Sequence, residues 1–208
     1  MTSPAPSADE PVYQDRVYRS PMAMVGGVLL LALVVWLCGD ALVRGTGNEP
    51  WFGAAAALLV VPLAVAFTLR PAVFANADRM RVRNPFRTIE LPWASVEALR
   101  SGYSAEVCTE NAKYQLWAIP VSLRDRKKAN RQIARREALS RKGEMDAQSA
   151  GDTPRAQADK HVDELRELAG NGAKREGAQG PAVVRWAYEI IAPAVAGAVL
   201  MTVLLATR

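Results

Sequence analysis

The 208-residue chain is poor in the side chains that usually build catalytic and metal centres. It has one histidine and two cysteines, and only 7% of its residues are aromatic. His161 lies in a polar stretch where a solvated side chain is expected, and Cys38 and Cys108 show no metal-site spacing. The stretch 45–47 (GTG) lacks the Gly-Lys-Ser/Thr of a phosphate-binding loop. Since no nucleophile and base can be paired, we expect a protein that is not an enzyme and that carries no cofactor and no metal.

Charge is also missing from three long stretches of the chain. Residues 20–39, 50–69 and 190–207 contain no Asp, Glu, Lys or Arg. A helix rises ~1.5 Å per residue, so ~20 apolar residues cross the ~30 Å hydrocarbon core of a bilayer. Lipid offers the backbone no hydrogen-bond partners, so such segments must be helical. We therefore predict transmembrane helices over about 21–43, 51–70 and 185–207, the first two forming a hairpin within 20–69.

The basic residues predict how these helices are oriented. Of 26 Lys and Arg residues, 22 lie between Arg70 and Arg185, and two more precede the first helix. Cytoplasmic loops hold the excess of Lys and Arg in membrane proteins. We therefore expect a multi-pass protein of the plasma membrane. Its N-terminus and the region between the second and third helices would be cytoplasmic, and the 40–49 turn and the C-terminus extracytoplasmic.

The cytoplasmic region begins with a pattern typical of short antiparallel strands. In 79–83 (RMRVR) apolar and basic residues alternate, and Asn84-Pro85 is a turn signal. Further strands are expected at 86–91, 95–101, 104–109 and 113–119, with a weaker one at 72–75. After Pro120, Ser122 is placed to cap a basic helix that runs to about Lys142. We predict a small β domain over 70–142, closed by that basic helix.

Two segments have too few large apolar residues to predict a packed structure. Residues 143–184 are rich in Gly, Ala, Gln, Asp and Ser, and they are expected to form a flexible linker with a short polar helix near 161–169. The N-terminal tail, 1–19, contains three prolines and is expected to be disordered. The predicted fold class is thus an α+β membrane protein with a helical hairpin, a β domain, a linker and a third span.

Several short patterns in a fixed order resemble a known family. They are 69–73 (LRPAV), 82–88 (VRNPFRT), 91–93 (LPW) and 116–124 (LWAIPVSLR), all preceded by two closely spaced spans. They resemble actinobacterial membrane proteins with a bacterial pleckstrin-homology (PH) domain, the type named after a low-molecular-weight mycobacterial protein antigen. The resemblance covers about residues 16–128. It implies a strongly bent antiparallel β domain closed by a C-terminal helix, and no enzyme activity.

Two basic clusters are the candidate contact sites for lipid headgroups or a protein partner. The first is Arg79, Arg81, Arg83 and Arg87 on neighbouring predicted strands; the second is Arg124, Arg126, Lys127 and Lys128. Basic residues near a membrane are attracted to anionic headgroups by about 1 kcal/mol each. The alternative for both clusters is an ordinary solvated face. Nucleic acid is disfavoured because the second cluster has no aromatic residues for base stacking.

The sequence leaves two functions open. The preferred hypothesis is a non-enzymatic membrane protein that presents a cytoplasmic PH-like domain to a protein partner, a second copy or the anionic lipid surface. The alternative is an accessory subunit of a larger membrane enzyme or secretion complex. In that case small residues such as Ala54, Ala55, Ala194 and Ala198 would pack against helices of other subunits.

Overall fold

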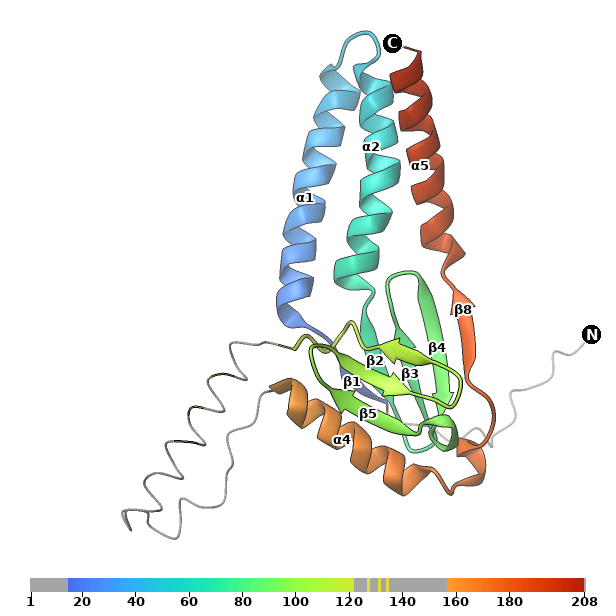
Figure 1. Ribbon diagram of the computed structural model, residues 1–208. Helices are drawn as coiled ribbons and strands as arrows, with labels where there is room; N and C mark the ends of the chain where they lie inside the picture. Colours follow the sequence, from blue (N-terminus) through green and yellow to red (C-terminus); the bar gives the residue numbers. More distant parts are fainter. Residues whose placement is uncertain (1–14, 122–126, 128–130, 132–133, 135–156, 208) are drawn as a thin grey trace, which may run out of the picture.

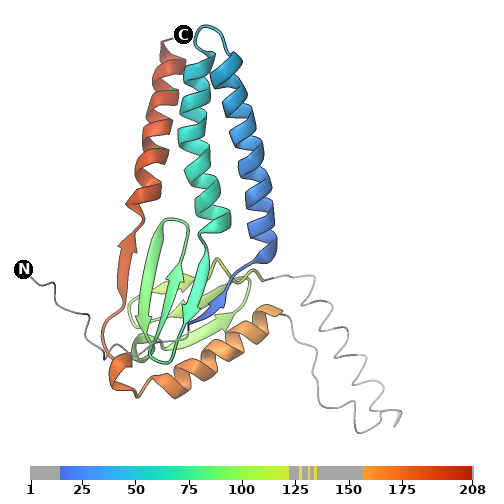
Figure 2. The same ribbon diagram turned by 180° about the vertical axis from the view of Figure 1, so that it is seen from behind.

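The structure is a computed structural model that describes residues 15–121, 127, 131, 134 and 157–207. Three long helices stand side by side, and a β domain lies at one end of them (Figure 1). Figure 2 shows the same arrangement from behind, with helix α4 running across the far side of the domain. The chain is therefore α+β, with an apolar helical part and a small antiparallel β part.

The three long helices are apolar along their whole length. They are α1 (Pro21–Arg44), α2 (Glu49–Ala64), which continues into a π-helical turn η1 (Val65–Leu69), and α5 (Tyr188–Ala206). The Ser20 side chain caps α1 by accepting the backbone N–H of Ala23, and Pro21 opens the helix where its missing N–H does no harm. Each helix is long and apolar enough to cross a membrane, as the sequence predicts.

Helix α2 is central, because both α1 and α5 pack against it through small residues. A side chain at Gly27 of α1 would collide with Thr68, and one at Gly197 of α5 would lie 2.5 Å from the Leu59 backbone nitrogen. Ala55 and Ala194 are buried in the same contacts. Close backbone approach through small residues is the usual means of packing helices in lipid. These small residues therefore serve contacts within the chain's own bundle.

The β domain has two antiparallel sheets, both built mainly from the expected strands. The larger has the order β1-β2-β3-β4-β8, and the smaller the order β5-β6-β7. The strands are β1 (Arg16–Tyr18), β2 (Ala72–Ala75), β3 (Arg79–Arg83), β4 (Arg87–Pro92), β5 (Ala98–Ser101), β6 (Ala105–Cys108), β7 (Lys113–Gln115) and β8 (Val183–Trp186). Short 3-10 turns, η2 (Trp93–Ser95) and η4 (Glu176–Ala178), connect parts of the domain.

The alternation read from the sequence determines which side chains enter the core. Met80 and Val82 of β3 are fully buried, whereas Arg79, Arg81 and Arg83 point to the opposite face. Most other large apolar residues of the expected strands are also buried, namely Ile89, Leu91, Trp93, Leu99, Val107, Leu116 and Ile119, whereas Phe86 and Val96 are half-buried. Trp117 is 46% exposed, since it points away from its neighbour Leu116.

A helix that closes the β domain lies inside the segment expected to be a linker. Helix α4 (Gln157–Gly172) buries Val162 and Leu165 completely against the sheet, and Arg166 donates to the Leu99 carbonyl at 2.9 and 2.7 Å. Burying two such side chains contributes roughly 1.5–3 kcal/mol each. The polar helix expected at 161–169 is thus longer and packed. The basic helix expected to close the domain lies mostly outside the described residues; within it, Lys127, Arg131 and Ala134 are helical and exposed.

The two edge strands of the larger sheet, β1 and β8, were not expected from the sequence. The described end of the tail, expected to be disordered, forms β1, which pairs with β2 in the register Tyr18↔Val73. Strand β8 pairs with β4 in the register Val184↔Ile89, so the third long helix begins at Tyr188 and not at 185. Strands of three or four residues carry too little pattern to be read alone; their pairing partners determine them.

Tyr18 links β1 to α4, and its pKa provides a test of that contact. Its hydroxyl donates to a Glu164 carboxylate oxygen at 2.9 Å, and its ring meets His161 edge-on at 5.1 Å. Burial and then the neighbouring Glu164 raise the pKa of Tyr18 to about 12. The neutral hydroxyl therefore stabilises the fold below pH 10, and this contribution is lost as pH rises toward 12.

We expect Tyr18→Phe to lower the free energy of unfolding at pH 8 by about 1.5 kcal/mol, because a hydrogen bond to a charged group is lost. Thermal unfolding of the full chain in detergent, measured from pH 8 to 12, checks this. The wild type should lose stability more steeply than the variant above pH 10. Parallel curves would contradict the assignment.

Candidate functional site

The described residues contain no cluster that suggests metal-dependent chemistry. Among them, no group of three or more His, Cys, Asp and Glu side chains is placed to hold a metal ion. His161, expected to be solvated, instead packs half-buried against Tyr18. Cys38 and Cys108 are free cysteines in different parts of the fold. The notable feature is a group of arginines where the β domain meets the long helices.

Arg70 is the central residue of this junction. The π-helical turn ends with the Arg70 N–H bonded to the Val65 carbonyl at 2.9 Å, a five-residue spacing that widens the last turn. The guanidinium donates to the Asn84 carbonyl at 3.2 Å, to Thr88 Oγ1 at 3.2 Å and to Glu189 Oε1 at 2.8 Å. One side chain thus joins the end of the second helix, the β3–β4 hairpin and the start of α5.

Aromatic contacts strengthen the same junction. The Phe67 ring of η1 lies 5.3 Å from Phe86 in the β3–β4 turn and 5.6 Å from Trp117. The Phe86 carbonyl accepts the N–H of Ala187, the single residue between β8 and α5, at 2.9 Å. Trp186 is 55% exposed at this level. Partly exposed aromatic rings beside the ends of apolar helices are typical of a membrane–water interface.

Three more guanidinium groups surround the ring of Phe74 on the outer face of the larger sheet. The Arg81 and Arg83 groups lie 4.8 and 5.1 Å from the ring centroid, and that of Arg19 lies 6.0 Å away. The register Phe74↔Arg81 places the ring directly opposite Arg81. Each cation–π contact is worth about 0.5–1 kcal/mol at a partly exposed site. We call Arg19, Phe74, Arg81 and Arg83 the outer arginine cluster.

The outer arginine cluster has more positive than negative charge. Arg81 meets one carboxylate, Asp15, at 3.5 Å. Within the described parts of the chain, no carboxylate pairs with Arg19 or Arg83. Burial, and then repulsion from Arg81, Arg70 and Arg19, lower the pKa of Arg83. That direction is expected for a partly buried cation that also has other cations beside it.

The structure separates the arginines that the sequence groups together. Arg81 and Arg83 belong to the outer arginine cluster, whereas Arg87 lies over the Tyr114 ring at 5.4 Å, nearer the smaller sheet. Arg79 is exposed and lines a polar hollow of about 200 Å³ with Asp15, Asn76, Phe74 and Arg81. Lys127 is exposed, and Arg124, Arg126 and Lys128 lie outside the described residues.

Sequence reasoning missed Arg19, Arg70 and Phe74. Arg19 and Arg70 directly flank the charge-free stretches, so their position next to helix ends was a readable signal. Phe74 lies in a strand expected from the sequence, but only the register shows that its ring meets three arginines. Cross-strand proximity depends on pairing, which no single strand encodes.

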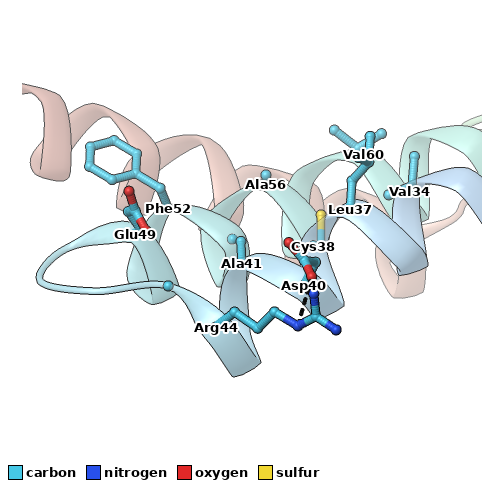
Figure 3. A pocket seen from close by; sticks show the side chains of 12 residues that line it. Val34, Leu37, Cys38, Asp40, Ala41, Arg44, Glu49, Phe52, Ala56 and Val60 are labelled. Atoms are coloured by element: carbon cyan, nitrogen blue, oxygen red, sulfur yellow. Dashed lines mark ion pairs between the residues drawn. The ribbon is translucent and has the colours of Figure 1, made fainter.

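A second hollow lies at the opposite end of the helices. Figure 3 shows this groove of about 670 Å³ between α1 and α2, with Leu37, Phe52 and Val60 on its wall. An ion pair between Arg44 and Asp40 at 3.4 Å lies at its rim. The groove is open and mostly apolar. It belongs to the helix surface that faces away from the β domain.

Arg70 and Glu189 yield a prediction about which contact holds the junction. Replacing Arg70 by Met leaves the Asn84 carbonyl and Thr88 without this donor, so we expect a loss of roughly 2 kcal/mol in unfolding free energy. Glu189 is 64% exposed at its side chain, so Glu189→Gln should lose under about 1 kcal/mol. Thermal unfolding of both variants and the double variant in detergent measures this. Equal losses would show that the ion pair, and not the bonds to the β domain, dominates.

Comparison with known proteins is consistent with the β architecture. The family model described as "Bacterial PH domain" matches residues 70–158, which include strands β2 to β7 and the first residues of α4. No curated protein matches the chain, and no solved structure does. Strands β1 and β8 and most of α4 lie beyond the matched segment, although they complete the same fold. Over residues 70–158, the chain is thus similar to bacterial PH domains.

Proposed function

We propose that this chain is a non-enzymatic, multi-pass protein of the plasma membrane that holds its PH domain against the cytoplasmic membrane surface for contact with a protein partner or anionic lipid. One observation carries the proposal. Strand β1 is separated from α1 by two residues, η1 from β2 by two, and β8 from α5 by one. Three such short connections leave the domain little freedom to move away from the membrane.

The orientation follows from charge. Four arginines lie at the end of the helices that carries the β domain. Arg19, Arg70 and Arg185 are within three residues of a helix end, and Arg83 pairs with Ala72, which follows the second helix closely. Among the described residues, the opposite end carries one arginine, Arg44, which is paired with Asp40. Since basic residues remain on the cytoplasmic side, the PH domain and the N-terminus are proposed to be cytoplasmic and the C-terminus extracytoplasmic.

The exposed residues Tyr103 and Lys127 mark the proposed surface for protein contact. Tyr103, in the β5–β6 turn, is 94% exposed. Lys127 belongs to the second basic cluster and is also exposed. Exposed aromatic and basic side chains are enriched among residues that bind protein partners.

The alternative, an accessory subunit of a larger membrane complex, has weaker support. Under that hypothesis, small residues such as Ala55 and Ala194 would pack against helices of other subunits. Ala55 and Ala194 are instead buried within this chain, in which α2 packs against both α1 and α5. Most of α1 remains exposed and apolar, which surrounding lipid is sufficient to cover.

Accessibility labelling tests the orientation. In a chain with Cys38→Ala and Cys108→Ala, single cysteines are introduced as Thr46→Cys, Lys113→Cys or Thr207→Cys, all at exposed positions. A membrane-impermeant maleimide added to intact cells should label positions 46 and 207 only. Position 113 should react only after the cells are permeabilised. Labelling of position 113 in intact cells would overturn the proposed orientation, and recovery of the chain in the soluble fraction would overturn membrane insertion.

A further inference from the structure

The outer arginine cluster lies close to the helix ends because of strand register. Arg83 pairs with Ala72, two residues after Arg70, where the second long helix ends. Arg19 precedes the first residue of α1, Pro21, by two positions. A strand rises ~3.3 Å per residue, so Arg83 lies roughly 7 Å beyond the end of the helix. Strands β2 and β8 continue the direction of helices α2 and α5 in Figure 1.

That distance corresponds to the headgroup layer. The hydrocarbon core is ~30 Å thick and the whole bilayer ~40–45 Å, which leaves about 5–8 Å of headgroups on each side. An arginine side chain attached at this level reaches lipid phosphates without leaving the surface of the sheet. Phe74 and Arg81 lie two residues farther along the strands, roughly 7 Å beyond Arg83 and outside that layer. Arg19 and Arg83 are therefore the members of the cluster that are attached at headgroup level.

The outer arginine cluster has fewer carboxylate partners than guanidinium groups. Two carboxylates, Asp15 and Glu189, each meet one arginine, Arg81 and Arg70. Arg19 and Arg83 have no ion pair within the described residues. A phosphate group offers several acceptor oxygens and a negative charge, which match forked guanidinium donors.

We propose that Arg19, Arg81 and Arg83, gathered around Phe74, bind the phosphate of an anionic phospholipid in the leaflet where α1 and α2 end. This inference rests on the membrane insertion in the proposed function and adds a ligand to it. Arg19 and β1 lie outside the segment matched by the family model, so the site is built by this chain's union of the PH domain with its first helix. A lipid is favoured over an acidic protein because two of the three arginines, Arg19 and Arg83, are attached close to the ends of the long helices.

The test uses the full chain in a neutral detergent, titrated with phosphatidylglycerol or phosphatidylcholine and followed by native mass spectrometry. The wild type should bind one phosphatidylglycerol saturably and phosphatidylcholine much more weakly. Arg83→Gln and Arg19→Gln should each weaken phosphatidylglycerol binding about tenfold, because each removes a charge-assisted contact. Arg100→Gln is the matched control: Arg100 is exposed on β5 in the other sheet, and its replacement should change nothing.

Three results would overturn the inference. One is unchanged binding by both cluster variants, provided that their unfolding temperatures show them to be folded. Another is an equal loss on Arg100→Gln, which would indicate attraction by net charge alone. The third is full displacement of phosphatidylglycerol by millimolar inorganic phosphate in the wild type, which would identify a site for a small anion. If accessibility labelling supports insertion while these titrations fail, the proposed function stands and only the lipid site is wrong.

Discussion

The structure depends on the short covalent connections between three strands and three apolar helices. Strands β1, β2 and β8 belong to one sheet. Each is connected to a different long helix through one or two residues. The helices therefore determine where the sheet can lie, and Arg70 fixes the arrangement by bonding to the hairpin and to α5. A domain on a long tether could move away from its helices, whereas this one is held directly against them.

This arrangement also explains how so small a β domain acquires a core. A domain of ~60 residues buries only ~60% of its unfolded surface and is marginally stable. Here β1 is drawn from before the first helix, and α4 and β8 from before the third, and they bring Tyr18, Val162 and Leu165 into the core. The PH domain matched over residues 70–158 is thus completed by segments on both sides of it. Removing those segments would expose the apolar inner face of the sheet.

The sequence predicts the elements whose pattern is long or strongly periodic. Charge-free stretches predict all three apolar helices, and alternation at 79–83 predicts β3 with Met80 and Val82 inward. Strands β1 and β8 are too short to show alternation, and their pairing is decided by distant residues such as Val73 and Ile89. Helix α4 was visible only as a short polar helix because its buried face consists of few residues, among them Val162 and Leu165, within a charged segment. Its packing follows from the tertiary fold and not from local pattern.

The candidate site was predictable in charge but not in geometry. The arginines near the helix ends satisfy the rule that orients membrane helices, and that rule alone would permit them to be scattered and solvated. Register instead gathers three of them around Phe74 and leaves two without a carboxylate among the described residues. Scattered arginines would meet the topological requirement equally well without mutual repulsion. Their convergence on one ring is therefore a property that orientation does not explain and that the proposed anionic ligand would explain.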